Sequence, residues 1–159
     1  MSHNLHFRKV QHFTTGTTGP KGQRIFFLQF GNSGELMTLQ LEKMQIRALA
    51  EFLDQLIGDV EPISPDDVPI ALDLIEPVQP EWIVSSIGVA FEEDNSEFVI
   101  VAEEQSDESD PSVVQIHLSP GQVKAFILRA TDVVRAGRPP CTYCGEPLNH
   151  SDGWCPCSN

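Results

Sequence analysis

Four cysteines stand together near the end of the sequence, and they are the residues best suited to chemistry. The stretch that holds them is "CTYCGEPLNHSDGWCPC", and no cysteine occurs before it. The spacing is Cys-x2-Cys, then ten residues, then Cys-x-Cys. Four thiolates are the ligand set of a closed, tetrahedral zinc site. We therefore predict one structural zinc ion, held by Cys141, Cys144, Cys155 and Cys157.

The two cysteine pairs differ in their spacing, which leaves the identity of the fourth ligand undecided. Cys141 and Cys144 form a zinc knuckle, because Gly145 lets the backbone turn its amides toward the sulfur atoms. The second pair has one intervening residue where two are usual, so His150 is an alternative fourth ligand to Cys157. A closed set leaves no position for water or substrate, which argues against metal catalysis.

Two other interpretations of the cysteines are weaker. A disulfide is disfavoured in a reducing cytoplasm. A redox-active Cys141–Cys144 pair normally opens a helix, whose dipole lowers the pKa of the thiol. Here prolines at 139, 140 and 147 flank the pair and break a helix. Structural zinc is the interpretation we adopt, and metal binding would also supply the folding free energy of so short and polar a tail.

Charge is distributed unevenly along the chain of 159 residues, which has a formal net charge of -13. Between Ala48 and Val123 there is no lysine or arginine, yet this stretch holds 18 of the 23 acidic residues. Such a surface repels nucleic acid and acidic membranes. No apolar run is long enough for a transmembrane helix, and the N-terminal residues lack the apolar centre of a secretion signal. We expect a cytoplasmic protein, with the acidic stretch either aiding solubility or docking a basic protein partner.

The hydrophobic pattern predicts two similar halves. Strands are expected at 5–13, 24–30 and 35–41, followed by a helix over 42–57 with Ile46, Leu49 and Phe52 on its buried face. Strands are again expected at 81–91, 97–104 and 112–118, followed by a helix capped by Ser119 and Gln122 and stopped by Gly137. Residues 59–80 between the halves hold five prolines and read as an extended connector that packs on the body.

The two strand–helix junctions also align in sequence. "LEKMQIRAL" (41–49) matches "LSPGQVKAF" (118–126) at an offset of 77 residues, which pairs Leu49 with Phe126. We read this as a pseudo-repeat of a βββα unit, and we predict an α+β fold with a largely antiparallel sheet and two packed helices. The chain then divides into a first half (1–58), an acidic connector (59–80), a second half (81–138) and a zinc-knuckle tail (139–159).

The chain resembles the uncharacterised bacterial domain-of-unknown-function family 3090. The resemblance rests on "GTTGPKGQRIFFLQF", "LEKMQIRALAEFLDQLIGDV" and "LSPGQVKAFILRATDVV", and on the tail, where Cys141, Cys144, Gly145, Pro147, Leu148, Cys155 and Pro156 match. The family's tail has a histidine that this chain lacks at the corresponding place, and Cys157 appears instead. The resemblance supports the element boundaries and the metal, and it implies no established activity.

Two other groups of residues are candidate sites. The loop Gly16–Arg24, "GTTGPKGQR", could cradle a phosphate, but it lacks the Walker spacing and no helix follows it, so a hairpin loop is favoured. His3, His6 and His12 are scattered, and His117 precedes a helix cap, where a packed or capping histidine is the common outcome.

These observations favour a non-enzymatic zinc-binding protein that acts as an adaptor or regulator through protein contacts. One alternative is an enzyme or small-molecule binder that uses the cleft between the halves and the Gly16–Arg24 loop. Another is a zinc- or redox-sensing thiol element.

The first prediction concerns zinc binding by the cysteine tail. The purified protein should carry about one zinc ion per chain, and Cys157→Ser should weaken zinc binding much more than His150→Ala, because Cys157 can chelate the ion together with Cys155. Zinc affinity of the two variants measures this, with circular dichroism as the control for the helices. Loss of zinc with His150→Ala and its retention with Cys157→Ser would reverse the assignment.

Overall fold

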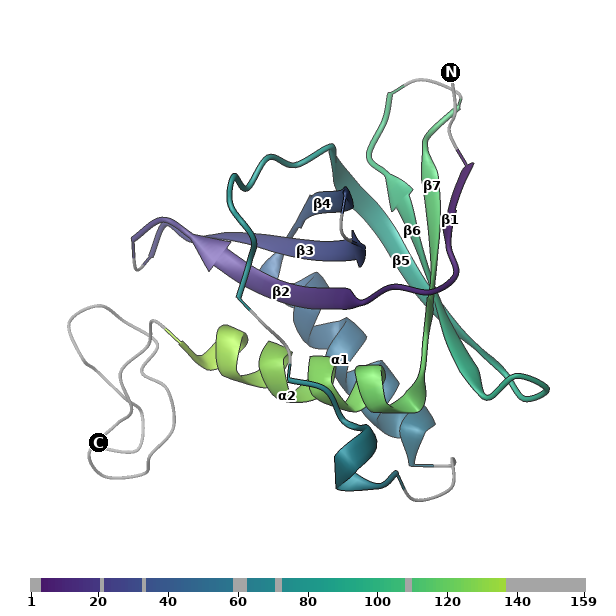
Figure 1. Ribbon diagram of the computed structural model, residues 1–159. Coiled ribbons are helices and arrows are strands. Elements are labelled where there is room, and N and C mark those ends of the chain that lie inside the picture. Colours follow the sequence, from purple (N-terminus) through teal and green to yellow (C-terminus); the bar gives the residue numbers. More distant parts are fainter. Residues whose placement is uncertain are drawn as a thin grey trace, which may run out of the picture.

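The protein has an α+β fold with one mixed sheet and two long helices (Figure 1). The computed structural model describes residues 4–20, 22–32, 34–58, 63–70, 73–107 and 110–136. Its elements, in chain order, are β1 (Asn4–Phe7), β2 (His12–Thr18), β3 (Ile25–Asn32), β4 (Glu35–Leu41), α1 (Lys43–Ile57), the 3-10 helix η1 (Pro65–Asp67), β5 (Trp82–Glu92), β6 (Glu97–Glu104), β7 (Val113–Leu118) and α2 (Pro120–Arg135).

The sheet contains seven strands in the order β1-β7-β6-β5-β4-β3-β2. Neighbours within β2–β3–β4 and within β5–β6–β7 are antiparallel. The two groups join through a short parallel seam, in which Leu39 and Gln40 of β4 face Trp82 and Ile83 of β5. β1 adds in parallel to β7 at the far edge. Figure 1 shows β2–β4 running across the direction of β5–β7, with both helices on one side of the sheet.

The sheet curls because its two edge strands are consecutive in sequence. A flat sheet of seven strands spaced about 4.8 Å apart would separate β1 from β2 by about 29 Å. Five residue steps from Phe7 to His12 reach about 18 Å at most. A hydrogen bond at Val10 stabilises the curl: the Val10 carbonyl accepts a 2.6 Å hydrogen bond from Gln122 Nε2 at the start of α2. The Gln11 amide adds a 3.2 Å bond to the Gly31 carbonyl at the end of β3.

The hydrophobic core fills the inside of the curl. Phe30, Phe98 and Phe126 are fully buried, and they come from β3, β6 and α2. The Phe13 and Phe126 rings meet edge to face with their centroids 5.0 Å apart. Each helix contacts the other helix, while α1 also packs against β5 and α2 against β2. Every layer of the core therefore combines residues from both halves of the sequence.

Most of the expected elements are present, and three expectations were wrong. The strand expected over 5–13 is divided by the Arg8–Gln11 link, and β2 continues through Gly16 to Thr18, where the loop Gly16–Arg24 was expected to begin. The regular pairing of β2 with β3 overrides the local glycine preference. Phe52 was expected on the buried face of its helix, but it is 47% exposed. Leu49 and Phe126 are both buried, and the Ser119–Gln122 capping box is confirmed.

The proline-rich connector is held across the sheet by one buried glutamine. Both Gln29 side-chain atoms bind the backbone of Ile75, with Oε1 accepting from the amide at 2.7 Å and Nε2 donating to the carbonyl at 3.0 Å. Gln29 also bonds to His12 Nε2 and to Thr38 Oγ1, so its hydrogen-bonding capacity is filled. One residue away, Leu74 covers Gly16, where an added Cβ would lie 2.6 Å from Leu74 Cγ. The connector therefore packs on the body, as expected.

Gln29→Met should lower the free energy of unfolding by about 1–3 kcal/mol, because it keeps the side-chain length and removes the partners of buried polar groups. Urea unfolding measures this. The matched control is Gln40→Met. Gln40 lies on the neighbouring strand β4, on the same face of the sheet as Gln29, and its half-buried side chain has no hydrogen bond within the described part of the chain. Equal losses from the two variants would contradict the role given to Gln29.

Candidate functional site

The predicted zinc ligands lie in a part of the chain that the structure does not describe. Cys141, Cys144, Cys155, Cys157 and the alternative ligand His150 all belong to residues 137–159, outside the described ranges. The same is true of Gly137, the expected end of the second helix. The described helix α2 ends at Arg135, and the Ala136 carbonyl accepts a hydrogen bond from Arg24 Nη1.

The alternative of a binding site at the Gly16–Arg24 loop depends on what surrounds Arg24. The second guanidinium nitrogen, Arg24 Nη2, donates to Thr17 Oγ1 at 3.0 Å, and the group lies over the Phe26 ring, 5.7 Å from its centroid. His12 bonds instead to Gln29. His6 is exposed on β1, in the sheet edge that pairs with β7. Arg24 therefore links the β2–β3 hairpin to the end of α2 through hydrogen bonds.

A groove of about 880 Å³ runs between the end of α1, the connector and α2. Its apolar lining includes Ile57, Val68 and Leu128. Its charged lining consists of Asp54, Asp132, Lys124 and Arg129, and Arg129 already forms a 2.9 Å ion pair with Asp73. Because both signs of charge are present in equal number, the charge of this groove selects no class of partner.

A second hollow of about 780 Å³ lies where β6 ends and β7 begins. These two strand ends are near the top of Figure 1. Four carboxylates line it, and no lysine or arginine does: the acids are Glu81, Glu104, Asp107 and Asp110. Trp82, which is partly exposed, supplies an aromatic wall. One Glu104 oxygen accepts the Ser112 amide at 3.0 Å, which fixes this carboxylate at the rim. We call this feature the acidic hollow.

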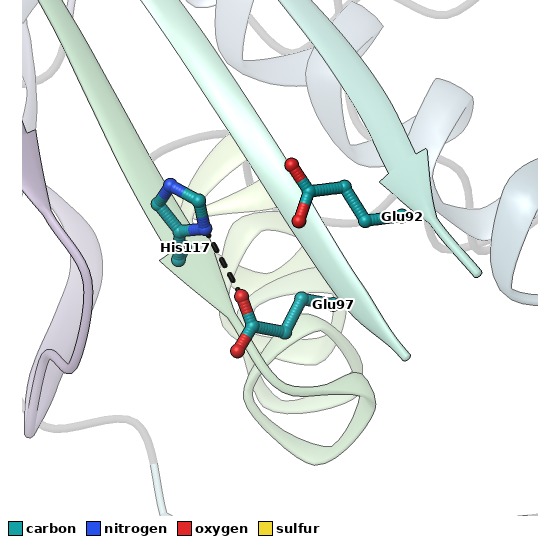
Figure 2. A group of neighbouring side chains, drawn as sticks. All are labelled: Glu92, Glu97 and His117. Atoms are coloured by element: carbon teal, nitrogen blue, oxygen red, sulfur yellow. Dashed lines mark hydrogen bonds and ion pairs between the residues drawn. The ribbon is translucent and has the colours of Figure 1, made fainter. Parts of the chain in front are cut away.

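Three further polar side chains meet at the opposite end of β5 and β6: Glu92, Glu97 and His117 (Figure 2). Glu92 is the last residue of β5 and Glu97 the first of β6, and the two face each other directly across the hairpin. His117 lies on β7, is 7% exposed, and places Nδ1 3.0 Å from Glu97 Oε2. Nδ1 is turned toward both carboxylates in Figure 2.

Sequence reasoning missed both the acidic hollow and this group of three. His117 was expected as a packed or capping histidine, and it is indeed packed. Its acidic neighbours follow from strand register: Val99 pairs with His117, and Glu97 lies two residues before Val99 on the same face. The only local indication was the acidic hairpin "FEEDNSE" (91–97), which has no cation of its own.

Comparison with known proteins gives a family and no activity. A family model described as "Protein of unknown function (DUF3090)" matches residues 5–155. No curated protein matches the chain. Neither helix in the described ranges has the length and apolar character needed to cross a membrane. The match extends over nearly the whole chain, and its position agrees with the resemblance seen in the sequence. The chain belongs to the DUF3090 family of proteins of unknown function.

Proposed function

We propose that this protein is a non-enzymatic, zinc-binding adaptor or regulator that acts by binding a protein partner with a basic segment. The zinc part rests on the cysteine spacing of the tail over residues 139–159, with one structural ion held by Cys141, Cys144, Cys155 and Cys157 or His150. Thiolate ligands require a reducing compartment, for which we propose the cytoplasm.

The observation that carries the partner proposal is the acidic hollow. Its four carboxylates have no lysine or arginine among the lining residues, so a cationic ligand would be attracted from every side. A partner's arginine fits this lining best, because its guanidinium can pair with a carboxylate through two hydrogen bonds and stack on the Trp82 ring. The lining is more polar than apolar in character, which suits an exposed peptide segment better than a buried hydrophobic anchor.

We also propose that residues 1–58 and 81–138 hold two copies of one βββα unit that share a single core. The copies are β2–β4 with α1 and β5–β7 with α2, and β1 is an addition to the first half. Gln45 and Gln122 are equivalent in the sequence alignment, and they make equivalent bonds. Each side-chain oxygen accepts the amide of its own helix cap, Glu42 at 2.7 Å or Ser119 at 3.0 Å. Each Nε2 donates to a carbonyl of the opposite half, Val84 at 3.3 Å or Val10 at 2.6 Å. This reciprocity supports the repeat.

The alternative of an enzyme or small-molecule binder at the Gly16–Arg24 loop receives less support. Arg24 is engaged by Thr17 and Ala136 in the described structure, so binding an anion there would require it to exchange partners. A sensing role for the thiols remains compatible with the zinc proposal, since both use the same four cysteines.

An arginine-rich peptide should bind the protein through the acidic hollow. The double variant Glu81→Gln, Asp107→Asn should raise the dissociation constant about tenfold, which corresponds to about 1.4 kcal/mol. Fluorescence anisotropy of a labelled peptide measures this at fixed salt, because charge-driven binding depends on ionic strength.

The matched control is Asp66→Asn, Asp67→Asn, which removes the same charge from the exposed helix η1. It should change the dissociation constant by less than about twofold, a small difference beside the tenfold effect. Equal weakening by both double variants would mean that the peptide responds to net charge alone, and the hollow would then have no specific role.

A further inference from the structure

We propose that Glu92, Glu97 and His117 form a binding site for a divalent first-row metal ion, separate from the cysteine tail. The three side chains come from adjacent antiparallel strands, at the end of the sheet where the β5–β6 hairpin turns. They share the face of the sheet that points away from the helices. Phe98, Ile116 and Leu118, their sequence neighbours, point into the core.

The spacing of the donor atoms is close to that of a chelating set. His117 Nδ1, a Glu92 oxygen and a Glu97 oxygen all lie within 4.8 Å of one another. Two ligands bound at right angles, each about 2.1 Å from an ion, are about 3.0 Å apart. The His117 Nδ1–Glu97 Oε2 distance of 3.0 Å matches this value. Glu92 is exposed, so its side chain can rotate inward without disturbing the core.

Electrostatics favours a cation between these carboxylates. Glu92 and Glu97 are directly opposite in the antiparallel pair, where like charges destabilise a sheet. Glu93 and Asp94 in the turn add negative charge, and no lysine or arginine occurs between Ala48 and Val123. A divalent ion would remove the repulsion between the two glutamates. The relief of this repulsion would contribute favourably to the free energy of ion binding.

The imidazole is held in place before any ion binds. The His117 side chain is 8% exposed, and its backbone is paired in the sheet with Val99 of β6. Its ring therefore loses little conformational freedom on coordination. In the absence of an ion, Nδ1–H donates to the ionised Glu97 carboxylate, which can only accept. An ion between the carboxylates would take the place of this proton, and the neutral ring would then carry its proton on Nε2 and offer the Nδ1 lone pair to the metal.

The donor set indicates which ions fit. Carboxylate and imidazole ligands suit Mn²⁺, Fe²⁺ and Zn²⁺, whereas the thiolates of the tail select zinc and other soft ions. Three protein ligands leave coordination positions for water, unlike the closed set proposed for the cysteines. Mn²⁺ is therefore the probe that separates the two sites, because it binds oxygen and nitrogen and avoids thiolate.

The test measures Mn²⁺ binding by electron paramagnetic resonance on the full chain, after one equivalent of zinc has been added for the tail. Wild-type protein should bind about one Mn²⁺ per chain. Glu92→Gln and Glu97→Gln should each weaken binding at least about tenfold. Glu93→Gln is the matched control, since it removes the same charge from the neighbouring exposed position. It should change the affinity by less than about twofold, which would be a minor electrostatic effect.

Several results would overturn the proposal. One is the absence of stoichiometric Mn²⁺ binding to wild-type protein. Another is equal weakening by Glu92→Gln and Glu93→Gln, which would reveal a diffuse negative potential. A third is loss of Mn²⁺ in Cys141→Ser, Cys144→Ser with retention in Glu92→Gln, which would place the ion in the tail. Paramagnetic broadening of the His117 ring signals is expected in wild type, and unbroadened ring signals at saturating Mn²⁺ would exclude this residue as a ligand.

Discussion

The short link between the two edge strands of the sheet is the constraint on which the rest of the structure depends. Because Arg8–Gln11 must join β1 to β2, the sheet cannot remain open and flat. Its seven strands bend around the helices, and the bend falls at the seam where only two residue pairs join β4 to β5. The interior then receives phenylalanines from both arms of the sheet, while the outer face of β5–β7 remains available for polar side chains.

The proline-rich connector is positioned by non-local contacts of its own. In the described parts of the connector, residues 63–70 lie beside the end of α1 and α2, and Leu74 and Ile75 lie over the outer face of β2 and β3. Proline prevents this segment from joining the sheet as a strand. The side chain of Gln29 instead satisfies the backbone of Ile75, and Gly16 leaves room for Leu74. The connector is thus positioned by a few specific contacts and not by a strand ladder.

Local patterns in the sequence were enough for most elements, because helix caps and alternating apolar residues act over a few positions. Ser119 and Gln122 marked the start of α2, and the strand expected over 97–104 agrees with β6. Non-local features could not be predicted in this way. The parallel pairing of β1 with β7 and the burial of Gly16 under Leu74 depend on residues more than fifty positions apart. Phe52 has the right helical spacing, yet it is left 47% exposed.

The candidate sites show the same difference between local and non-local features. The cysteine ligands could be proposed because their spacing is encoded within a few residues of one another. The acidic hollow draws on four separate segments, and the group of Glu92, Glu97 and His117 depends on the register of three strands. No spacing in the linear sequence distinguishes these acids from the other acidic residues of the middle region.

The reciprocal packing of the halves has a consequence for synthesis on the ribosome. Helix α1 ends at Ile57, but its contacts come from β5 and from α2, which ends at Arg135. At roughly 5–20 residues per second, the 78 residues between these two positions take about 4–16 s to synthesise. During that interval α1 cannot make its contacts with α2, so this part of its apolar face must stay collapsed on the strands already made or be shielded by a chaperone. The nascent first half therefore depends on the second half to complete its fold.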